Sequence, residues 1–367
     1  MSAQEDVKFL AKLVHRGHLN RDEAEPLLPQ LKQGAALDGL LASLDGWGDA
    51  RVQKMRRTSA GEKPEVPGHE ILSPLGIGGT AEVFRARAKA TGKTLALKIL
   101  TAPYAKNPVE VKAFIEEARL LERLDHPGLV KGYGPAKADG TYLSRMEVVD
   151  GRTLQEYLDD GHLFDEDAAL RAILEVAEVL RYMAGEGLVH RDIKPGNIML
   201  STSGRVKLID LGFCAEGGSR DAEGCARGTV QYLSPEQAEG GAEADIRSDI
   251  YALGVTLYQL TIGQLPFEGE CDEDVLRKHV MERLSSPELK GRGHSPHLHY
   301  FIEKMMSKDA ELRYQNWDEL VTDVGEQVEG RASLDFKAGA GQQRGRGRGV
   351  SGRGTGSTGR GTGGRRN

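Results

Sequence analysis

The chain has 367 residues, of which 39% are hydrophobic and 28% are charged, as is typical of a globular protein. Its net charge of −6 is uneven, because seven Arg after Ala338 carry +7 and leave −13 on the remainder. Three Cys without a C-x-x-C pair exclude a disulfide framework and a zinc site of that type. No run of about 18 apolar residues predicts a transmembrane segment, and no apolar stretch predicts a signal peptide, so we expect a cytoplasmic protein.

The first 50 residues predict a small helical module. Apolar side chains recur three and four positions apart over Val7–Val14, which places them on one helical face. Residues 51–67 are polar and basic with two Pro, and we expect them to form a linker. Thr58 and Ser59 follow two Arg there and are candidate autophosphorylation sites, although an ordinary basic linker explains the same residues.

The pattern changes at residue 68 from helical to strand-like. Strands are expected where apolar residues alternate or run together, and a helix where they recur at helical spacing. After residue 150 helices dominate, so the sequence predicts an α+β protein with a sheet-rich lobe followed by a helical lobe. The clearest elements are strands over Ile71–Leu75, Ala81–Ala88, Thr94–Leu100 and Tyr142–Val149, and helices over Ala113–Leu124 and Ala168–Met183.

Closely spaced glycines at Gly76, Gly78 and Gly79 lie between the first two predicted strands. Glycines let main-chain N–H groups approach phosphate oxygens without a clash of side chains. A dinucleotide-binding turn or a plain hairpin would show the same glycines. A dinucleotide-binding fold, however, needs a helix directly after them, and here a second strand follows.

Lys98 stands inside the apolar third strand, where a charge needs a partner or a route to water. The next predicted helix offers Glu116 and Glu117. Glu117 shares a helical face with the apolar Phe114 and Leu121, so we expect it to point inwards and Glu116 to face solvent. Lys98 and Glu117 are therefore a candidate ion pair.

The segment His190–Asn197 reads H-R-D-I-K-P-G-N and follows a predicted helix. The glycine loop, Lys98 and Glu117 precede it, while Asp210-Leu211-Gly212 and Ser234-Pro235-Glu236 follow it, in the order of the protein kinase signatures. From about Gly68 to Glu329 the chain resembles the eukaryotic-like (Hanks-type) bacterial serine/threonine protein kinase family. Ala81, Leu211 and Ser234 depart from the usual motifs, but none of these changes removes a charge that the reaction needs.

The resemblance implies a bilobal protein kinase-like fold, ATP and Mg²⁺ as cofactors, and a role for each matching residue. Asp192 would orient the substrate hydroxyl, Lys194 would steady the γ-phosphate, and Lys98, oriented by Glu117, would bind the α- and β-phosphates. Asn197 and Asp210 would hold the metal. The implied nucleotide site comprises Leu75, Gly76, Ile77, Gly78, Gly79, Val83, Ala96, Lys98, Met146, Glu147, Val149 and Met199.

The family resemblance also implies structural and regulatory roles. Asp249 would anchor the catalytic loop, and Glu236 would pair with Arg313. Arg191 precedes the catalytic Asp, a pattern associated with control by phosphorylation, for which Ser219 is the candidate site. A second hypothesis is that acidic residues of the same loop pair with Arg191 in place of a phosphate; these are Glu216, Asp221 and Glu223.

The predicted organisation is a helical module (1–50), a linker (51–67), a protein kinase catalytic domain (68–329) and a disordered Gly/Arg-rich basic tail (330–367). We expect a kinase that phosphorylates Ser and Thr of proteins and itself in intracellular signalling. A pseudokinase would commonly have lost one of the reactive residues, all of which are present here. The tail could bind nucleic acid or an acidic partner, but no aromatic residue after Phe336 offers a stacking platform.

Overall fold

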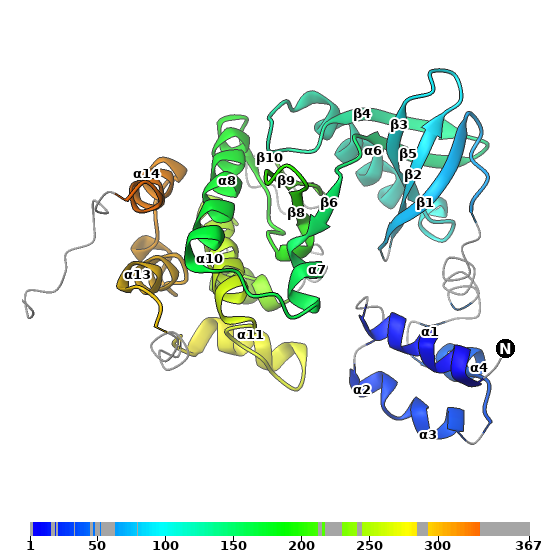
Figure 1. The fold of residues 1–367 in the computed structure, drawn as a ribbon, viewed down its shortest axis with the longest axis horizontal. Coiled ribbons are helices and arrows are strands. Elements are labelled where there is room, and N and C mark those ends of the chain that lie inside the picture. Colours follow the sequence, from blue (N-terminus) through cyan, green and yellow to red (C-terminus); the bar gives the residue numbers. More distant parts are fainter. Residues whose placement is uncertain are drawn as a thin grey trace, which may run out of the picture.

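A computed structural model describes residues 3–15, 19, 21–32, 34–44, 47, 52, 63–78, 80–211, 215–216, 230–240, 244–284 and 293–330. Most of the predicted linker, with Thr58 and Ser59, lies outside these residues. The same holds for Ser219 and for the predicted tail from residue 331 onwards. The described elements are shown as a ribbon in Figure 1.

Four short helices at the N-terminus share a hydrophobic core of their own. Leu10, Leu37 and Leu41 are among its buried side chains, as the helical spacing in this region predicted, and Trp47 joins them. Val7, which the same spacing placed on the packed face of the first helix, is 37% exposed. Pro29 falls inside one of these helices without breaking it, because it occupies the first turn, where main-chain N–H groups have no partner within the helix. The helices are α1 (Ala3–His15), α2 (Arg21–Ala24), α3 (Leu27–Lys32) and α4 (Leu37–Ala42).

The sheet-rich lobe is built on one antiparallel sheet in the order β1-β2-β3-β5-β4. Its strands are β1 (His69–Ile77), β2 (Ala81–Ala88), β3 (Thr94–Leu100), β4 (Gly132–Ala138) and β5 (Thr141–Met146). The four predicted strands are confirmed, except that the last one ends at Met146 and not at Val149. Beyond Met146 the main-chain N–H of Glu147 donates to the carbonyl of Lys131, and the chain leaves the sheet towards the helical lobe.

Helix α6 (Pro108–Arg123) packs on this sheet after the short 3-10 helix η1 (Tyr104–Lys106). Asn107 caps its N-terminus, and Phe114, Ala118 and Leu121 form its buried face. The chain then passes so close to α6 that a Cβ at Gly132 would lie 2.6 Å from the main-chain carbon of Leu121. The absence of a side chain at Gly132 therefore allows the contact between β4 and α6.

The helical lobe contains α7 (Leu154–Asp159), α8 (Glu166–Gly185), α9 (Pro235–Ala238), α10 (Ile246–Ile262), α11 (Asp272–Met281), α13 (Pro296–Met305) and α14 (Trp317–Val328). Helix α10 is buried from Ser248 to Ile262 and packs against α8 and α13. A helix that is apolar all round belongs in the centre of a domain, and this one carries the lobe's core. Short 3-10 segments are η2 (Pro195–Asn197), η4 (Val230–Tyr232) and η5 (Ala310–Leu312).

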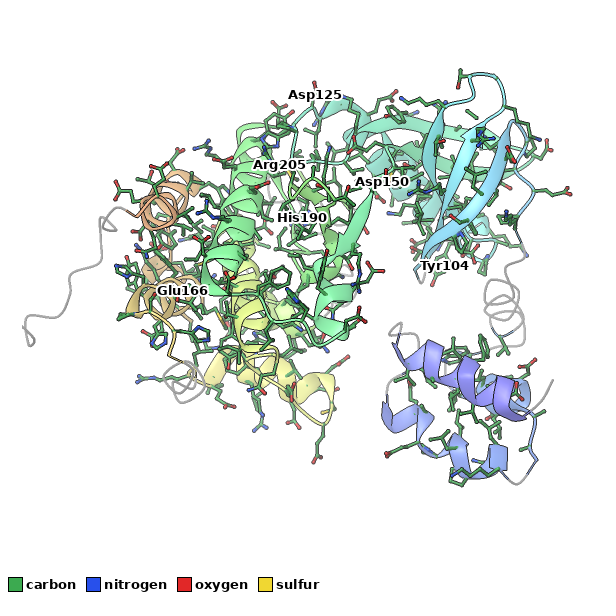
Figure 2. The ribbon with its side chains drawn as sticks, in the orientation of Figure 1. Tyr104, Asp125, Asp150, Glu166, His190 and Arg205 are labelled. Carbon is green, nitrogen blue, oxygen red and sulfur yellow. The ribbon has the colours of Figure 1, made fainter. Side chains whose placement is uncertain are left out.

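Two small sheets support the segment between α8 and α9. Strands β6 (Gly151–Thr153), β8 (Ile198–Ser201) and β9 (Val206–Leu208) form one sheet, and β7 (Leu188–Val189) pairs with β10 (Ala215–Glu216) in the other. The loop that begins at His190 therefore leaves β7 and reaches η2 within a few residues. Figure 2 shows His190 among these short strands, between α8 and the sheet-rich lobe in this view.

Candidate active site

The register of the five-stranded sheet brings the predicted nucleotide residues of β2, β3 and β5 to one face. Val83 pairs with Lys98, and Ala96 pairs with Met146. Because side chains alternate between the faces of a strand, Ala96 and Lys98 share a face, whereas Leu95, Leu97 and Ile99 pack into the core on the opposite side. Lys98 is thus held on the face of the sheet that joins the core of the helical lobe.

The ammonium group of Lys98 lies between two carboxylates from different parts of the chain. Its Nζ donates to Oε1 of Glu117 at 2.6 Å and to Oδ1 of Asp210 at 3.1 Å. The Glu117 side chain is 17% exposed and that of Glu116 is 60% exposed, so the predicted difference between the two residues is confirmed. Helix α6 and the segment after β9 are therefore joined through one lysine on β3.

Burial opposes the charge of Lys98, but the Asp210 and Glu117 carboxylates outweigh it and raise the pKa of the lysine. Burial raises the pKa of the Glu117 carboxyl, and the Lys98 ammonium counteracts that rise. The lysine consequently stays protonated at neutral pH and can neutralise a negatively charged group beside it. A charge at this depth is stable only because two carboxylates share it.

Asp249 of α10 fixes the start of the loop that runs from His190 to Asn197. Its two carboxylate oxygens accept the main-chain N–H groups of His190 and Arg191 at 2.8 and 2.7 Å, and Asp249 is only 2% exposed. Arg191 has φ = 69°, a left-handed conformation that is strained for a residue with a Cβ. Nε2 of His190 lies 2.8 Å from the carbonyl oxygen of Asp210, so the loop and the Asp210 segment are connected.

Three residues of the loop form a second polar cluster around Asp192. Nζ of Lys194 lies 3.0 and 2.8 Å from the two carboxylate oxygens of Asp192. The amide nitrogen of Asn197 donates to the Asp192 main-chain carbonyl at 2.8 Å and to its carboxylate at 2.9 Å. Both N–H bonds of the amide are thus directed at Asp192, which fixes the direction of the Asn197 carbonyl oxygen.

The structure describes some of the remaining predicted nucleotide residues fully and others only in part. Leu75 is 45% exposed at the end of the sheet. The main chain of Ile77 belongs to β1, but its side chain and the whole of Gly79 lie outside the described residues. Met199 on β8 is partly buried and pairs with Thr153.

One contact at Glu147 was not predicted from the sequence. Lys207 on β9 forms an ion pair with the Glu147 side chain and also donates to the carbonyl of Leu129. Neither residue carries a recognisable motif, and the pairing depends on how two distant strands meet. Lys207 therefore attaches the segment after β5 to the helical lobe.

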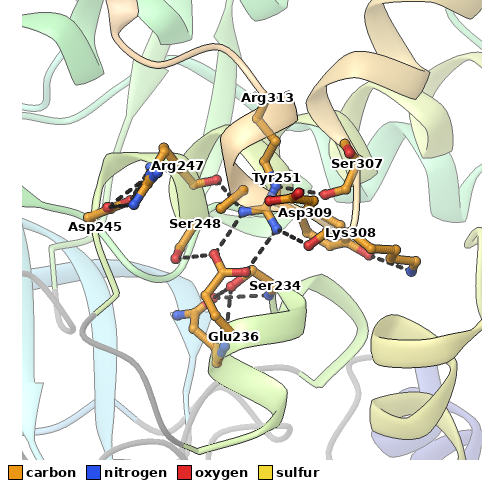
Figure 3. A network of polar contacts seen from close by, with 12 residues as sticks. Ser234, Glu236, Asp245, Arg247, Ser248, Tyr251, Ser307, Lys308, Asp309 and Arg313 are labelled. Carbon is orange, nitrogen blue, oxygen red and sulfur yellow. Dashed lines mark hydrogen bonds and ion pairs between the residues drawn. The ribbon is translucent and has the colours of Figure 1, made fainter.

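A further ion pair in the helical lobe joins α9 to Arg313 and is drawn in Figure 3. Nη1 and Nη2 of Arg313 donate to the two carboxylate oxygens of Glu236 at 2.7 and 2.8 Å, as the sequence predicted. Ser248 donates to the same carboxylate at 2.7 Å. The Arg313 side chain is fully buried, so this pair holds α9 against α10 and the segment before α14.

His190 connects the Lys98, Glu117 and Asp210 group to the Asp192 cluster. Comparison of the sequence with known proteins points to one family for this arrangement. The family model described as "Protein kinase domain" matches residues 69–323. The chain belongs to the protein kinase family. A probable serine/threonine-protein kinase of Streptomyces coelicolor is 35% identical over 286 residues, which are 74% of this chain and 42% of that protein.

Other relatives within the family carry similar names. Serine/threonine-protein kinase PknB of Mycobacterium tuberculosis is 34% identical over 265 residues, or 70% of this chain and 42% of PknB. Serine/threonine-protein kinase PrkC of Bacillus subtilis is 33% identical over 258 residues, or 70% of this chain and 40% of PrkC. The match thus spans about two fifths of these relatives. Among the described residues, no helix is both long enough and apolar enough to cross a bilayer.

Proposed function

We propose that this chain is a serine/threonine-protein kinase that transfers the γ-phosphate of ATP to Ser and Thr hydroxyls of proteins. The observation that carries the proposal is the position of Lys98 between Glu117 and Asp210 at 2.6 and 3.1 Å. In protein kinases this Lys–Glu pair and a metal-binding Asp must be in place together for phosphoryl transfer. The named relatives support the same activity.

The residues around Asp210 suit a magnesium ion. Mg²⁺ prefers oxygen ligands and is commonly held by one or two protein groups together with substrate phosphates. Asp210 offers a carboxylate, and the fixed amide of Asn197 offers its carbonyl oxygen. When bound, the metal neutralises the charge of the transferred phosphoryl group. Asp210 and Asn197 are the residues that would hold it.

The other residues act by position and charge. Asp192 accepts hydrogen bonds from Lys194 and Asn197, and its proposed role is to orient the hydroxyl of the substrate and to accept its proton. The Lys194 ammonium lies next to that carboxylate and adds positive charge where the phosphoryl group arrives. The main-chain groups of Glu147 and Val149 are proposed to bind adenine; since the N–H of Glu147 donates to Lys131, its carbonyl is the group offered.

The proposal is tested by incorporation of ³²P from [γ-³²P]ATP into the protein itself and into a basic protein such as myelin basic protein. We expect wild type to be active and Asp192→Asn to lose at least about 100-fold in rate while still binding ATP. The matched control is Asp125→Asn, which changes an exposed carboxylate that is distant in sequence from the His190–Asn197 loop. This variant should keep full activity. If wild type binds ATP but labels neither protein, the chain is a pseudokinase and the proposal fails.

Further parts of the proposal concern residues outside those described. Autophosphorylation at Thr58 or Ser59 stays a prediction that peptide mapping after incubation with ATP tests. Function in the cytoplasm, and a partner for the Arg/Gly-rich tail, likewise stay predictions. A salt-dependent binding assay with and without residues 338–367 separates a nucleic-acid ligand from an acidic protein.

A further inference from the structure

A partly buried lysine outside the candidate active site closes the C-terminal end of α11. Nζ of Lys308 donates to the main-chain carbonyls of His279 at 2.6 Å and Lys278 at 3.3 Å, and to the Tyr251 hydroxyl at 3.3 Å. It also lies 4.1 Å from the centre of the Phe267 ring. The three N–H donors of the ammonium are thus matched by three acceptors. A positive charge at the last carbonyls of a helix is favourable in itself.

The imidazole of His279 allows this cation to stay close. His279 is fully buried, its ring makes T-shaped contacts with those of Phe267 and Tyr251, and its Nδ1 lies 2.9 Å from the Tyr251 hydroxyl. Burial, reinforced by the nearby Lys308 ammonium, lowers the pKa of His279 to about 4. The imidazole is therefore neutral at pH 7 and does not repel Lys308, whose own pKa is lowered to about 8 by burial and by the Arg313 guanidinium.

The main chain of Lys308 is held from the opposite side by the ion pair of Figure 3. Arg313 donates to the carbonyls of Ser307 at 2.8 Å and Lys308 at 3.2 Å while it binds Glu236. The short loop between α13 and η5 therefore connects two features. Its carbonyls bind the arginine that anchors α9, and its lysine side chain binds the end of α11.

Helix α11 in turn supports the segment that leads into α9. It contacts both α9 and η4. Within η4, the Tyr232 hydroxyl donates to Gln259 at 2.6 Å. Gln259 belongs to α10, the helix whose Asp249 binds the main-chain N–H groups of His190 and Arg191. Segment η4 and the loop that carries Asp192 are therefore held by the same helix.

We propose that Lys308 is a positioning residue for the protein substrate: it fixes α11 and η4 relative to the catalytic loop and touches neither ATP nor the reacting atoms. The inference rests on the proposed kinase function. It distinguishes the two substrates, because the contacts of the Lys308 side chain among the described residues are with Tyr251, Phe267 and the carbonyls at the end of α11, and not with Lys98. Loss of Lys308 should weaken the use of protein substrate and leave the use of ATP unchanged.

The test compares Lys308→Met, which keeps the aliphatic stem and removes the donors, with Lys308→Arg, which keeps charge and donors. The control is Lys304→Met. Lys304 is a similarly enclosed lysine of α13 that lies 3.9 Å from the Tyr314 ring, away from α11. Initial rates are measured first with the concentration of myelin basic protein varied and then with that of ATP varied. Hydrogen exchange of the α11 amides is a second readout.

We expect Lys308→Met to lower kcat/KM for myelin basic protein at least about 10-fold and to change the KM for ATP by less than about twofold. Exchange in α11 should rise, and Lys308→Arg should restore most of the loss. If Lys308→Met does not fold, Tyr251→Phe removes one acceptor at nearly constant volume and should lower the same ratio about threefold.

The inference is overturned if Lys308→Met matches wild type. It is also overturned if kcat/KM for myelin basic protein and kcat/KM for ATP fall by the same factor. A general loss of stability would have that effect, and Lys304→Met would then show it too. A wild type that binds ATP without phosphorylating any probe refutes the proposed function, and this inference with it. An active wild type with unaltered Lys308 variants refutes the inference alone.

Discussion

The Glu236–Arg313 pair allows a stability prediction to be worked from the structure. Burial by itself would raise the pKa of the Glu236 carboxyl, but the hydrogen bonds and charge of Arg313, together with Ser248, outweigh it and lower the pKa to about 2. By linkage, such a shift from the ordinary value corresponds to about 3 kcal/mol of stability at pH 7. Glu236→Gln, which keeps the shape and removes the charge, should therefore lower the free energy of unfolding by about 3 kcal/mol.

The pH dependence follows from the direction of the shift. The pKa of Glu236 is lower in the folded state, so the unfolded state binds more protons between the two pKa values. The stabilisation is complete above about pH 5 and is lost as the pH falls towards 2. The difference between wild type and Glu236→Gln should shrink over that window. Urea denaturation at several pH values, followed by the fluorescence of the buried Trp317, measures it.

The matched control is Glu70→Gln. Glu70 pairs with Arg87 at 3.5 Å, but both side chains are more than half exposed. Exposed ion pairs contribute little, so this variant should change stability by less than about 0.5 kcal/mol at every pH. A loss for Glu236→Gln that is below about 1 kcal/mol at pH 7, or that is the same at pH 7 and pH 3, would refute the reasoning.

Three further predictions follow from single contacts. Gly132→Ala places a Cβ 2.6 Å from the Leu121 main chain and should push α6 outwards. The free energy of unfolding should fall by about 1–3 kcal/mol, and kinase activity should fall with it. Asp249→Asn removes the charged acceptor of two main-chain N–H groups of the catalytic loop and should lower stability by about 2–5 kcal/mol, measured by thermal unfolding. Lys207→Met releases the Glu147 side chain and should raise the Kd for a fluorescent ATP analogue about threefold with little change in Tm.

The fold could be predicted from the sequence wherever hydrophobic spacing was strong. The strands Ala81–Ala88 and Thr94–Leu100 were predicted at the bounds that the structure gives, because each is flanked by turn residues. The strand that ends at Met146 was predicted three residues too long, since Glu147–Val149 continues the apolar pattern without pairing in the sheet. Spacing reports which residues are buried, and burial continues there without a strand.

The candidate site was predicted from motif order and not from geometry. Lys98, Glu117 and Asp210 could be named because each stands in a recognisable motif, and the structure brings all three within one network of hydrogen bonds. Lys207 and Lys308 stand in no such motif. Their roles depend on main-chain carbonyls and rings supplied by segments distant along the chain, so no local pattern marks them.

The two unpredicted lysines show how the scaffold and the chemistry are connected. Lys207 attaches the segment that we propose binds adenine to a strand of the helical lobe, and Lys308 attaches α11 to the loop held by Arg313. Each is partly enclosed and donates to at least one main-chain carbonyl. Substitution of the residue that supplies the carbonyl does not remove this acceptor. We propose that residues of this kind set the geometry in which Asp192 and Lys98 act. Changes at Lys207 should therefore act through ATP and changes at Lys308 through protein substrate, although neither lysine contacts Asp192.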